Sequence, residues 1–343
     1  MNTKLSHLNY LLGTSGIALL LLGLVFTLNL LVDPLWFFAG NRFDNHNYRF
    51  NERVSKLNRL LKHRDDYDCL ILGSSRVTLL DERQLDVGRC YNLSFSGGSV
   101  AEFIAFAKYL QQQGVAPQTL VVGIDDFNFS QQTITPDLPD FVAENQAPDP
   151  LVRSYLSLSV LGFSWRALYG SDEARLLPRY YDEQLICRVR ENPPVYVTAG
   201  EIEKYSSLQE IFRAERAAYY LELRGLFPQA RFIAYVPPIS LWITLGREQG
   251  GSLPGYLRAI YESAQFFDQA WDFSAPSTIT ADASRTYDGS HYDLEANAQI
   301  ARVLNGEQST EGLALTGLSF DAYRSAFYRR LREQRQSVDR TES

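Results

Sequence analysis

The sequence has few of the residues that build metal sites and disulfide frameworks. It contains three cysteines and four histidines in 343 residues. The cysteines lack C-x-x-C spacing, and because their number is odd, at least one thiol has no partner. Cys69 lies in the apolar run Cys69-Leu-Ile-Leu72, where a small buried hydrophobic residue is expected. We predict neither a disulfide scaffold nor a metal site, and we expect no cofactor.

A surplus of positive charge is also lacking. Lys and Arg number 33 against 40 Asp and Glu, which gives a net charge of −7. Nucleic-acid binders need a basic face for phosphate contacts, and no Lys/Arg cluster dominates the central region. The composition therefore argues against a nucleic-acid partner, while 45% hydrophobic residues indicate a folded core.

One long apolar run near the N-terminus predicts a membrane anchor. Residues 11–32, after a short tail of residues 1–10, are almost wholly apolar and uncharged. About 20 helical residues cross the hydrocarbon layer of a bilayer. A cleaved signal peptide is the alternative, but the run exceeds the usual apolar region of about 7–15 residues and no A-x-A site follows. We therefore expect an uncleaved transmembrane helix.

The charges beside this helix do not settle its orientation. Lys4 precedes it, whereas Arg42, Arg49, Arg53 and Lys56 follow it. By the positive-inside rule, this distribution mildly opposes export of the C-terminal part. The topology therefore has to be argued from other features.

Residues 33–66 form a polar connector behind the anchor. Trp36, Phe37 and Phe38 at its start suit either the membrane interface or core packing near the membrane. Apolar residues at helical spacing then predict an amphipathic helix between anchor and domain: Val54, Leu57, Leu60 and Leu61.

Short apolar runs that alternate with helical stretches predict an α/β domain over residues 67–305. This alternation is typical of a parallel sheet with right-handed crossovers. The expected strands are residues 68–72, 89–94, 120–124, 231–236 and 270–274, and the expected helices are residues 100–113 and 201–226.

Two segments fall outside this alternation. Residues 131–200 are rich in Pro and aromatic residues and predict a large insertion. It could be a lid or substrate wall over the carboxyl ends of the strands, or a plain structural excursion. The tail, residues 306–343, has Tyr323, Phe327 and Leu331 at helical spacing among many arginines. A solvated helix is its simpler interpretation, and contact with anionic lipid or a partner is the alternative.

Two short motifs supply the parts of an acyl-transfer site, which needs a hydroxyl nucleophile, an imidazole base and an orienting carboxylate. In Gly73-Ser74-Ser75-Arg76 the glycine allows a sharp turn, and Ser75 falls where a helix N-terminus is expected. In Asp288-Gly-Ser-His291 the carboxylate can meet the imidazole within one turn. An N-cap serine and a capped surface turn are the structural alternatives.

Four blocks resemble, in chain order, those of SGNH (GDSL-type) hydrolases: Gly73-Ser-Ser75, Gly97-Gly98, Gly123-Ile-Asp-Asp126 and Asp288-x-x-His291. The resemblance covers roughly residues 68–300 and implies a three-layer, flavodoxin-like parallel sheet. It implies Ser75 as nucleophile, His291 as base and Asp288 as its orienter, with the amides of Ser75 and of Gly97 or Gly98 as oxyanion donors. The layout looks closest to membrane-attached SGNH proteins of lipoteichoic acid D-alanylation and exopolysaccharide O-acetylation.

Two positions depart from the family pattern. The third block usually carries an Asn whose amide donates to the oxyanion, whereas this chain has Asp125, which only accepts when ionised. Asn128 could substitute, although a turn residue is the simpler explanation. Ser74 replaces the acidic residue that usually precedes the nucleophile. Arg76 and Asp126 are candidate substrate-binding residues, and an ion pair between Arg76 and Asp125 or Asp126 is the simpler alternative.

The resemblance implies a serine acyltransferase or esterase that adds or removes an acetyl-like ester on an exported envelope polysaccharide or teichoic-type polymer. The N-terminus would lie in the cytoplasm and the domain outside the membrane, and a membrane-bound acyl-donating protein would be a fitting partner. Asp125 keeps open a second hypothesis, an inactive SGNH-like domain that binds a glycan or organises a membrane complex. The flanking charges keep open a third, a cytoplasm-facing lipid esterase.

Overall fold

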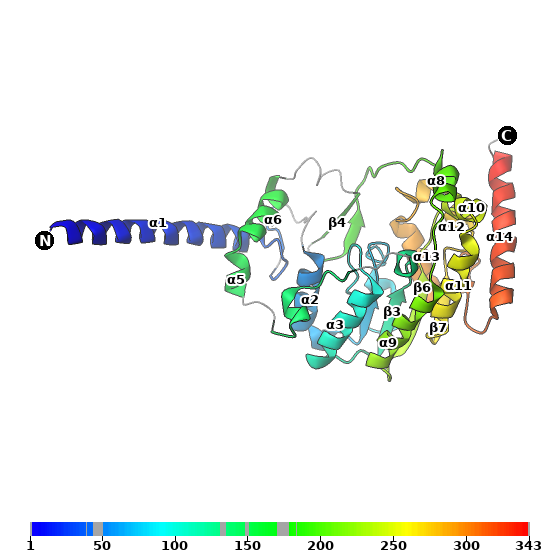
Figure 1. The fold of residues 1–343 in the computed structure, drawn as a ribbon, viewed down its shortest axis with the longest axis horizontal. Helices are drawn as coiled ribbons and strands as arrows, with labels where there is room; N and C mark the ends of the chain where they lie inside the picture. The colour runs from blue at the N-terminus through cyan, green and yellow to red at the C-terminus, as the bar shows by residue number, and fades with distance from the viewer. Residues whose placement is uncertain are drawn as a thin grey trace.

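The computed structural model describes residues 2–38, 40–43, 51–130, 135–147, 151–169, 178–182 and 184–341. His46 and Arg49 of the connector, and parts of the expected insertion, lie outside the described residues. Figure 1 shows an α/β body from which one long helix, α1 (Asn2–Val32), projects. Within α1, the 24 residues of Asn9–Val32 are long and apolar enough to cross a membrane. The structure thus supports the expected anchor and leaves its orientation open.

The body is built on a six-stranded sheet with the order β2-β1-β3-β6-β7-β8. Five strands are parallel, and they confirm the five strands expected from the sequence: β1 (Cys69–Leu72), β2 (Cys90–Asn92), β3 (Thr119–Gly123), β6 (Arg231–Val236) and β7 (Gln269–Asp272). A two-residue edge strand, β8 (Leu313–Ala314), pairs antiparallel with β7, so the sheet is mostly parallel.

Both faces of the sheet are buried, which explains why the central strands β1, β3 and β6 consist mostly of apolar residues. In β3, Leu120 and Val122 point into one core cluster and Val121 into the other. The larger cluster is covered by α3 (Val100–Gln112), α9 (Ala218–Leu226) and α11 (Leu253–Ala264). The smaller one is covered by α13 (Leu294–Leu304) and the residues that follow β1.

The connector helix and the C-terminal helix belong to this body. α2 (Glu52–Lys62) buries Leu57 and Leu60 in the larger core cluster. α14 (Phe320–Thr341) buries Tyr323, Phe327 and Leu331 in the same cluster. The interpretation of the tail as a solvated helix is therefore wrong for the face of α14 that carries these three residues, because they pack into the core.

The helix expected over residues 201–226 is interrupted. α8 (Glu201–Ser207) ends early, and the chain resumes with a 3₁₀ turn (Ala214–Ala217) that leads into α9. Between them, Phe212 forms an isolated bridge with Ser130. α8 packs against α10 (Leu241–Gln249), and a short helix, α12 (Thr278–Ala281), precedes the loop that leads to α13.

The described parts of the expected insertion divide into three. α4 (Asp140–Ala143) packs beside α3, whereas α5 (Leu151–Tyr155) and α6 (Leu158–Tyr169) pack against α1. β4 (Arg179–Tyr181) and β5 (Cys187–Val189) form an antiparallel hairpin. Among the described segments of the insertion, this hairpin contacts the turn after β1 that carries Ser75 (the nucleophile turn of the predicted site), through Arg179. One described part of the insertion thus packs on the anchor helix, and another contacts the turn that carries Ser75.

A disulfide joins Cys69 of β1 to Cys90 of β2, which face each other in the strand register. Cys187 remains free and buried. The prediction that Cys69 acts only as a buried hydrophobe is therefore wrong. The spacing of the two cysteines along the chain gave no hint of the bond, because the pairing depends on which strands are neighbours.

Trp36 is core rather than interface. It is 2% exposed and packs with Leu79, Tyr181 and Leu185 against the β4–β5 hairpin. Of the two phenylalanines that follow, Phe38 remains 43% exposed. The second alternative for this aromatic segment, core packing near the membrane, is the one that the structure supports for Trp36.

Candidate active site

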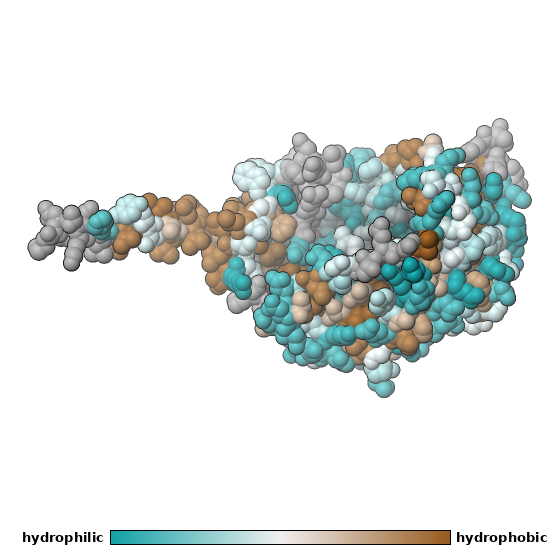
Figure 2. Space-filling model, in the orientation of Figure 1, coloured by the Kyte–Doolittle hydropathy of each residue, from teal (hydrophilic) through white to brown (hydrophobic). Residues whose placement is uncertain are grey.

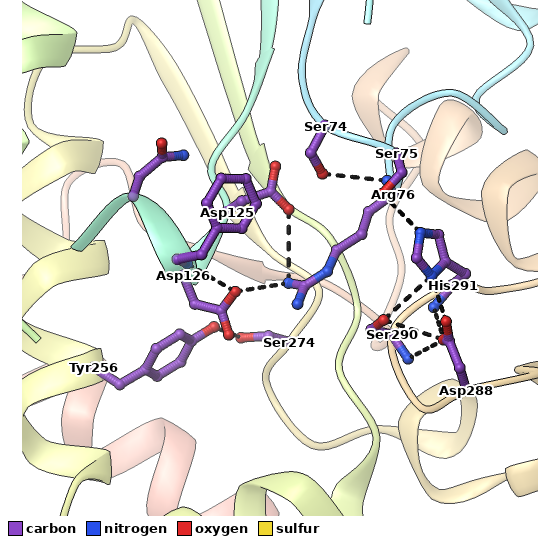
Figure 3. A network of polar contacts seen from close by, with 12 residues as sticks. Ser74, Ser75, Arg76, Asp125, Asp126, Tyr256, Ser274, Asp288, Ser290 and His291 are labelled. Atoms are coloured by element: carbon purple, nitrogen blue, oxygen red, sulfur yellow. Dashed lines mark hydrogen bonds and ion pairs between the residues drawn. The ribbon is translucent and has the colours of Figure 1, made fainter. Parts of the chain in front are cut away.

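The structure brings Ser75, His291 and Asp288 together at the carboxyl end of the sheet. Ser75 follows β1, and the other two lie in the loop before α13 (Figure 3). The Ser75 Oγ atom lies 2.8 Å from Nε2 of His291, and Nδ1 of His291 lies 2.7 Å from Oδ2 of Asp288. Ser75 and His291 are 216 positions apart in the chain. The geometry is that of a nucleophile, a base and an orienting carboxylate.

Local hydrogen bonds hold the Asp288–His291 loop in shape. The Thr286 hydroxyl donates to the carbonyl oxygen of His291 at 2.8 Å and accepts the amide of Gly289 at 3.0 Å. Gly289 has φ +83°, which an L side chain rarely adopts, so glycine is needed there. The ring of Tyr287 stacks on the imidazole with centroids 5.3 Å apart. The imidazole is thereby fixed on two sides.

The turn after β1 differs from the expected strand-to-helix turn. Residues 75–80 form successive turns and no regular helix follows them directly. Gly73 is required by space, because a Cβ atom there would lie 2.3 Å from the side chain of Val77. A helix dipole therefore does not act on Ser75, and the expectation of a helix N-terminus at this point is wrong.

Arg179 is a site residue that the sequence gave no reason to select. From the β4–β5 hairpin, its guanidinium donates to the carbonyl oxygen of Ser75 at 2.8 Å and to the Ser96 hydroxyl at 3.3 Å. It also donates to the Thr78 hydroxyl. The arginine thus joins the nucleophile turn to the loop that carries Gly97. It belongs to no sequence motif.

The Gly97-Gly98 turn lies beside the nucleophile turn. Gly98 approaches so closely that a Cβ atom would lie 2.7 Å from the carbonyl oxygen of Gly73. Its amide already donates to the Phe95 carbonyl oxygen at 3.0 Å. Within the described parts of the chain, the amides of Ser75 and Gly97 have no acceptor. These two amides are therefore better candidates for oxyanion donors than that of Gly98.

Arg76 extends away from His291 toward two buried carboxylates (Figure 3). Its Nη1 atom lies 3.1 Å from Oδ1 of Asp126 and 3.6 Å from Oδ1 of Asp125. Arg247, from α10, also donates to Asp126, at 2.5 Å, and pairs with Glu210. Burial favours the neutral carboxyl, but the two guanidinium groups outweigh it and hold the pKa of Asp126 well below its ordinary value. The ion pair expected for Arg76 is confirmed.

Asp125 is the least satisfied group of the site. Its side chain is fully buried, and among the described residues neither carboxylate oxygen makes a hydrogen bond of normal geometry, although the hydroxyl and the backbone of Ser74 help to lower its pKa. Burial raises the pKa of Asp125 from 3.8 to about 6, and the charge of Arg76 offsets only part of that effect. The carboxyl therefore titrates close to neutrality. When ionised it cannot donate to an oxyanion.

Asn128 is engaged elsewhere. Its Oδ1 atom accepts the amide of Val100, the first residue of α3, at 3.0 Å. Its Nδ2 atom lies 3.4 Å from the hydroxyl of Tyr220. The side chain thus ties α3 to α9 from within the core, and the structure gives no contact between it and the triad.

The charge states of His291 and Asp288 are those that general-base catalysis would need. Burial, more than any other effect, lowers the pKa of His291 below its usual 6.5, despite the neighbouring Asp288. Burial opposes ionisation of Asp288 as well, but the hydrogen bonds from His291 and from the backbone of Ser290, together with the charge of the imidazole, outweigh it and lower the pKa to about 2. At neutral pH the imidazole is therefore neutral and the carboxylate charged, as general-base catalysis requires.

A cavity of about 660 Å³ opens beside the nucleophile turn. Its walls combine charged groups with rings from α8 and from the loop that follows it: Arg76, Asp126, Arg247, Glu210, Tyr205 and Phe212. Among the described residues, no three His, Cys, Asp or Glu side chains gather as metal ligands.

No protein-family model, no curated protein and no solved structure matches the chain.

Proposed function

We propose that the chain is a membrane-anchored serine acyltransferase or esterase of the SGNH type. The observation that carries this proposal is the unbroken hydrogen-bonded series from Ser75 Oγ through His291 to Asp288. The two contacts are 2.8 Å and 2.7 Å long, and these are the hydrogen-bond distances expected between a nucleophile, the base that activates it and the group that orients the base. The strand order of the five parallel strands, which corresponds to the flavodoxin-like order 2-1-3-4-5, supports the same assignment.

The first half of the reaction would form an acyl-enzyme. His291 Nε2 takes the proton of the Ser75 hydroxyl while Oγ bonds to the carbonyl carbon of an ester donor. The resulting oxyanion is stabilised by the amides of Ser75 and Gly97. As the intermediate collapses, the bond to the leaving alkoxide breaks and the alkoxide receives the proton from His291. Asp288 stabilises the imidazolium throughout.

The second half would return the enzyme to its starting state. A hydroxyl of the acceptor, or water, gives its proton to His291 as its oxygen attacks the acyl carbon. Collapse of this second intermediate breaks the bond to Ser75 Oγ, which takes the proton back. An acceptor hydroxyl gives transfer and water gives hydrolysis. Both outcomes use the same residues.

We propose an exported polymer, a polysaccharide or teichoic-type chain, as the acceptor. The cavity beside Arg76 supports a hydroxylated acceptor, because its walls combine charged side chains with the rings of Tyr205 and Phe212. The Cys69–Cys90 disulfide supports a domain outside the cytoplasm, since such bonds persist in oxidising compartments. This favours a cytoplasmic N-terminus and weighs against a cytoplasm-facing lipid esterase. A membrane-bound acyl donor protein would supply the ester.

Asp125 favours one alternative, an inactive SGNH-like domain that binds a glycan or organises a membrane complex. A buried carboxylate that makes no hydrogen bond of normal geometry among the described residues stands where the family has an amide donor. If its charge repels an oxyanion, the triad could persist without turnover. The two proposals differ in whether Ser75 reacts.

Labelling with a fluorophosphonate separates them. The detergent-solubilised full chain is treated beside Ser75→Ala, His291→Ala and a control, Ser284→Ala, which changes an exposed serine outside the triad. The enzyme proposal expects wild type and the control to be labelled, no label on Ser75→Ala and slower labelling of His291→Ala. A folded wild type that takes no label would refute the enzyme and support the binding domain.

A further inference from the structure

The helix α6 is apolar on two opposite faces. One face is buried and carries Val160, Ser164 and Ala167. The other exposes Leu158, Trp165 and Tyr169, with exposed fractions of 75%, 59% and 58%. A helix on a water-facing surface would carry polar residues on its outer face. The outer face of α6 therefore requires an apolar environment.

This exposed face adjoins the end of the membrane helix. α5 and α6 pack against the last turns of α1, where Phe26 and Leu30 meet Tyr155 and Val160. Val152 of α5 is also exposed, at 57%. Figure 2 shows the hydrophobic surface of α1 continuing onto the end of the body that faces it. The apolar residues of α5 and α6 thus extend the lipid-facing surface of the anchor.

The length of the anchor fixes the depth of this surface. The apolar part of α1 runs over 24 residues from Asn9 to Val32. About 20 residues cross the hydrocarbon layer at 1.5 Å per residue. Phe26 and Leu30 lie in the last two turns of this run, so α5 and α6 contact α1 near the end of its membrane-spanning part. Trp and Tyr side chains are enriched at the boundary between acyl chains and headgroups, and Trp165 and Tyr169 lie with ring centroids 4.3 Å apart.

Buried polar contacts join α5 and α6 to α1. Asn29 of α1 donates to the carbonyl oxygen of Tyr155 and accepts the Ser164 hydroxyl, both at 2.8 Å. The Tyr155 hydroxyl donates to the carboxylate of Asp33. Asn29 and Asp33 are fully buried, so breaking these bonds would leave buried polar groups without partners. The three helices therefore form one unit.

We propose that α5 and α6 form a second membrane contact, in which Val152, Leu158, Trp165 and Tyr169 lie in the interface of the bilayer that α1 crosses. The occupant of this face is the boundary between lipid headgroups and acyl chains. Arg153 and Arg166, both exposed on these helices, suit the anionic headgroups of that leaflet. The body is then held at a fixed height and orientation above the membrane. The proposal rests on the membrane helix and is independent of any activity at Ser75.

Spin-label accessibility in vesicles tests this contact. Leu158→Cys and Trp165→Cys are made in the full chain, with Leu221→Cys as the control, because Leu221 is also an exposed leucine, 52% accessible, on α9 away from α1. Wild type is the blank, since its thiol Cys187 is buried and the other two cysteines are bonded. Each variant is labelled with a nitroxide and reconstituted in phosphatidylcholine–phosphatidylglycerol vesicles. Collision rates with dioxygen and with a water-soluble nickel chelate are then measured.

The proposal expects the labels at positions 158 and 165 to lose collisions with the nickel chelate and to gain collisions with dioxygen, relative to position 221. Nickel collisions at 158 and 165 that equal those at 221 would overturn it, because the face would then lie in water. Labels shielded from both reagents would overturn it as well, since a protein partner or a second copy would then cover the face.

Discussion

Replacing Asp125 by Asn is expected to stabilise the protein. Asp125 is a fully buried carboxylate without a hydrogen bond of normal geometry among the described residues, and burial outweighs the stabilisation that it receives from Ser74 and from Arg76, which it shares with Asp126. Asn has nearly the same shape and carries no charge. The substitution therefore removes a desolvated charge and leaves the closer ion pair of Arg76 with Asp126 in place.

The size of the effect follows from the pKa of Asp125. An ordinary value of 3.8 and a folded-state value of about 6 correspond to roughly 3 kcal/mol, since each tenfold change in a protonation equilibrium is worth about 1.4 kcal/mol. Because the pKa is higher in the folded state, the unfolded chain loses this proton more readily. The loss of stability caused by burying the ionised Asp125 is therefore complete above about pH 6 and disappears as the pH falls toward 4.

Thermal unfolding of the full chain in detergent measures this difference at pH 8, 6 and 4.5. We expect the unfolding midpoint of Asp125→Asn to exceed that of wild type by several degrees at pH 8, and the gap to close on acidification. The matched control is Asp126→Asn, which removes a carboxylate that pairs with both Arg76 and Arg247. Breaking this buried pair should destabilise the protein by about 3–5 kcal/mol.

Two results would refute the reasoning about Asp125. One is an Asp125→Asn variant that unfolds at a lower temperature than wild type at pH 8, which would mean that Arg76 and Ser74 stabilise the carboxylate by more than its burial costs. The other is a difference that does not change with pH, which would mean that Asp125 does not titrate near neutrality in the folded protein.

Three further predictions concern the disulfide, the base and the hairpin arginine. Replacing Cys69 and Cys90 together by Ser should cost about 3 kcal/mol of unfolding free energy in denaturant titrations, because the bond closes a loop with a sequence separation of 21; an unchanged stability would contradict this. The rate of fluorophosphonate labelling should fall on acidification with a midpoint below pH 6.5, since burial lowers the pKa of His291, and a midpoint above pH 7 would count against it. Arg179→Ala should slow labelling at pH 8 by about tenfold or more through displacement of Ser75, with Arg179→Lys partly restoring the rate, whereas equal rates in all three proteins would show that the contact is dispensable.

The sequence by itself determined the α/β class and the position of every strand in the parallel part of the sheet. These features are local, because a strand buried on both faces is a short apolar run and turn residues mark its ends. The same holds for the Asp288–His291 pair, whose spacing lets the two side chains meet within one loop. The apolar run of α1 also depends on local composition alone.

The tertiary structure alone decided the features that join distant parts of the chain. Cys69 pairs with Cys90 because β1 and β2 are neighbours in register, which their spacing along the chain does not encode. Arg179 reaches Ser75 from the insertion, across a sequence separation of 104. The state of Asp125 likewise depends on burial, and burial is a property of the folded whole. Local patterns specify elements and turns, whereas the partners of a side chain depend on how those elements pack.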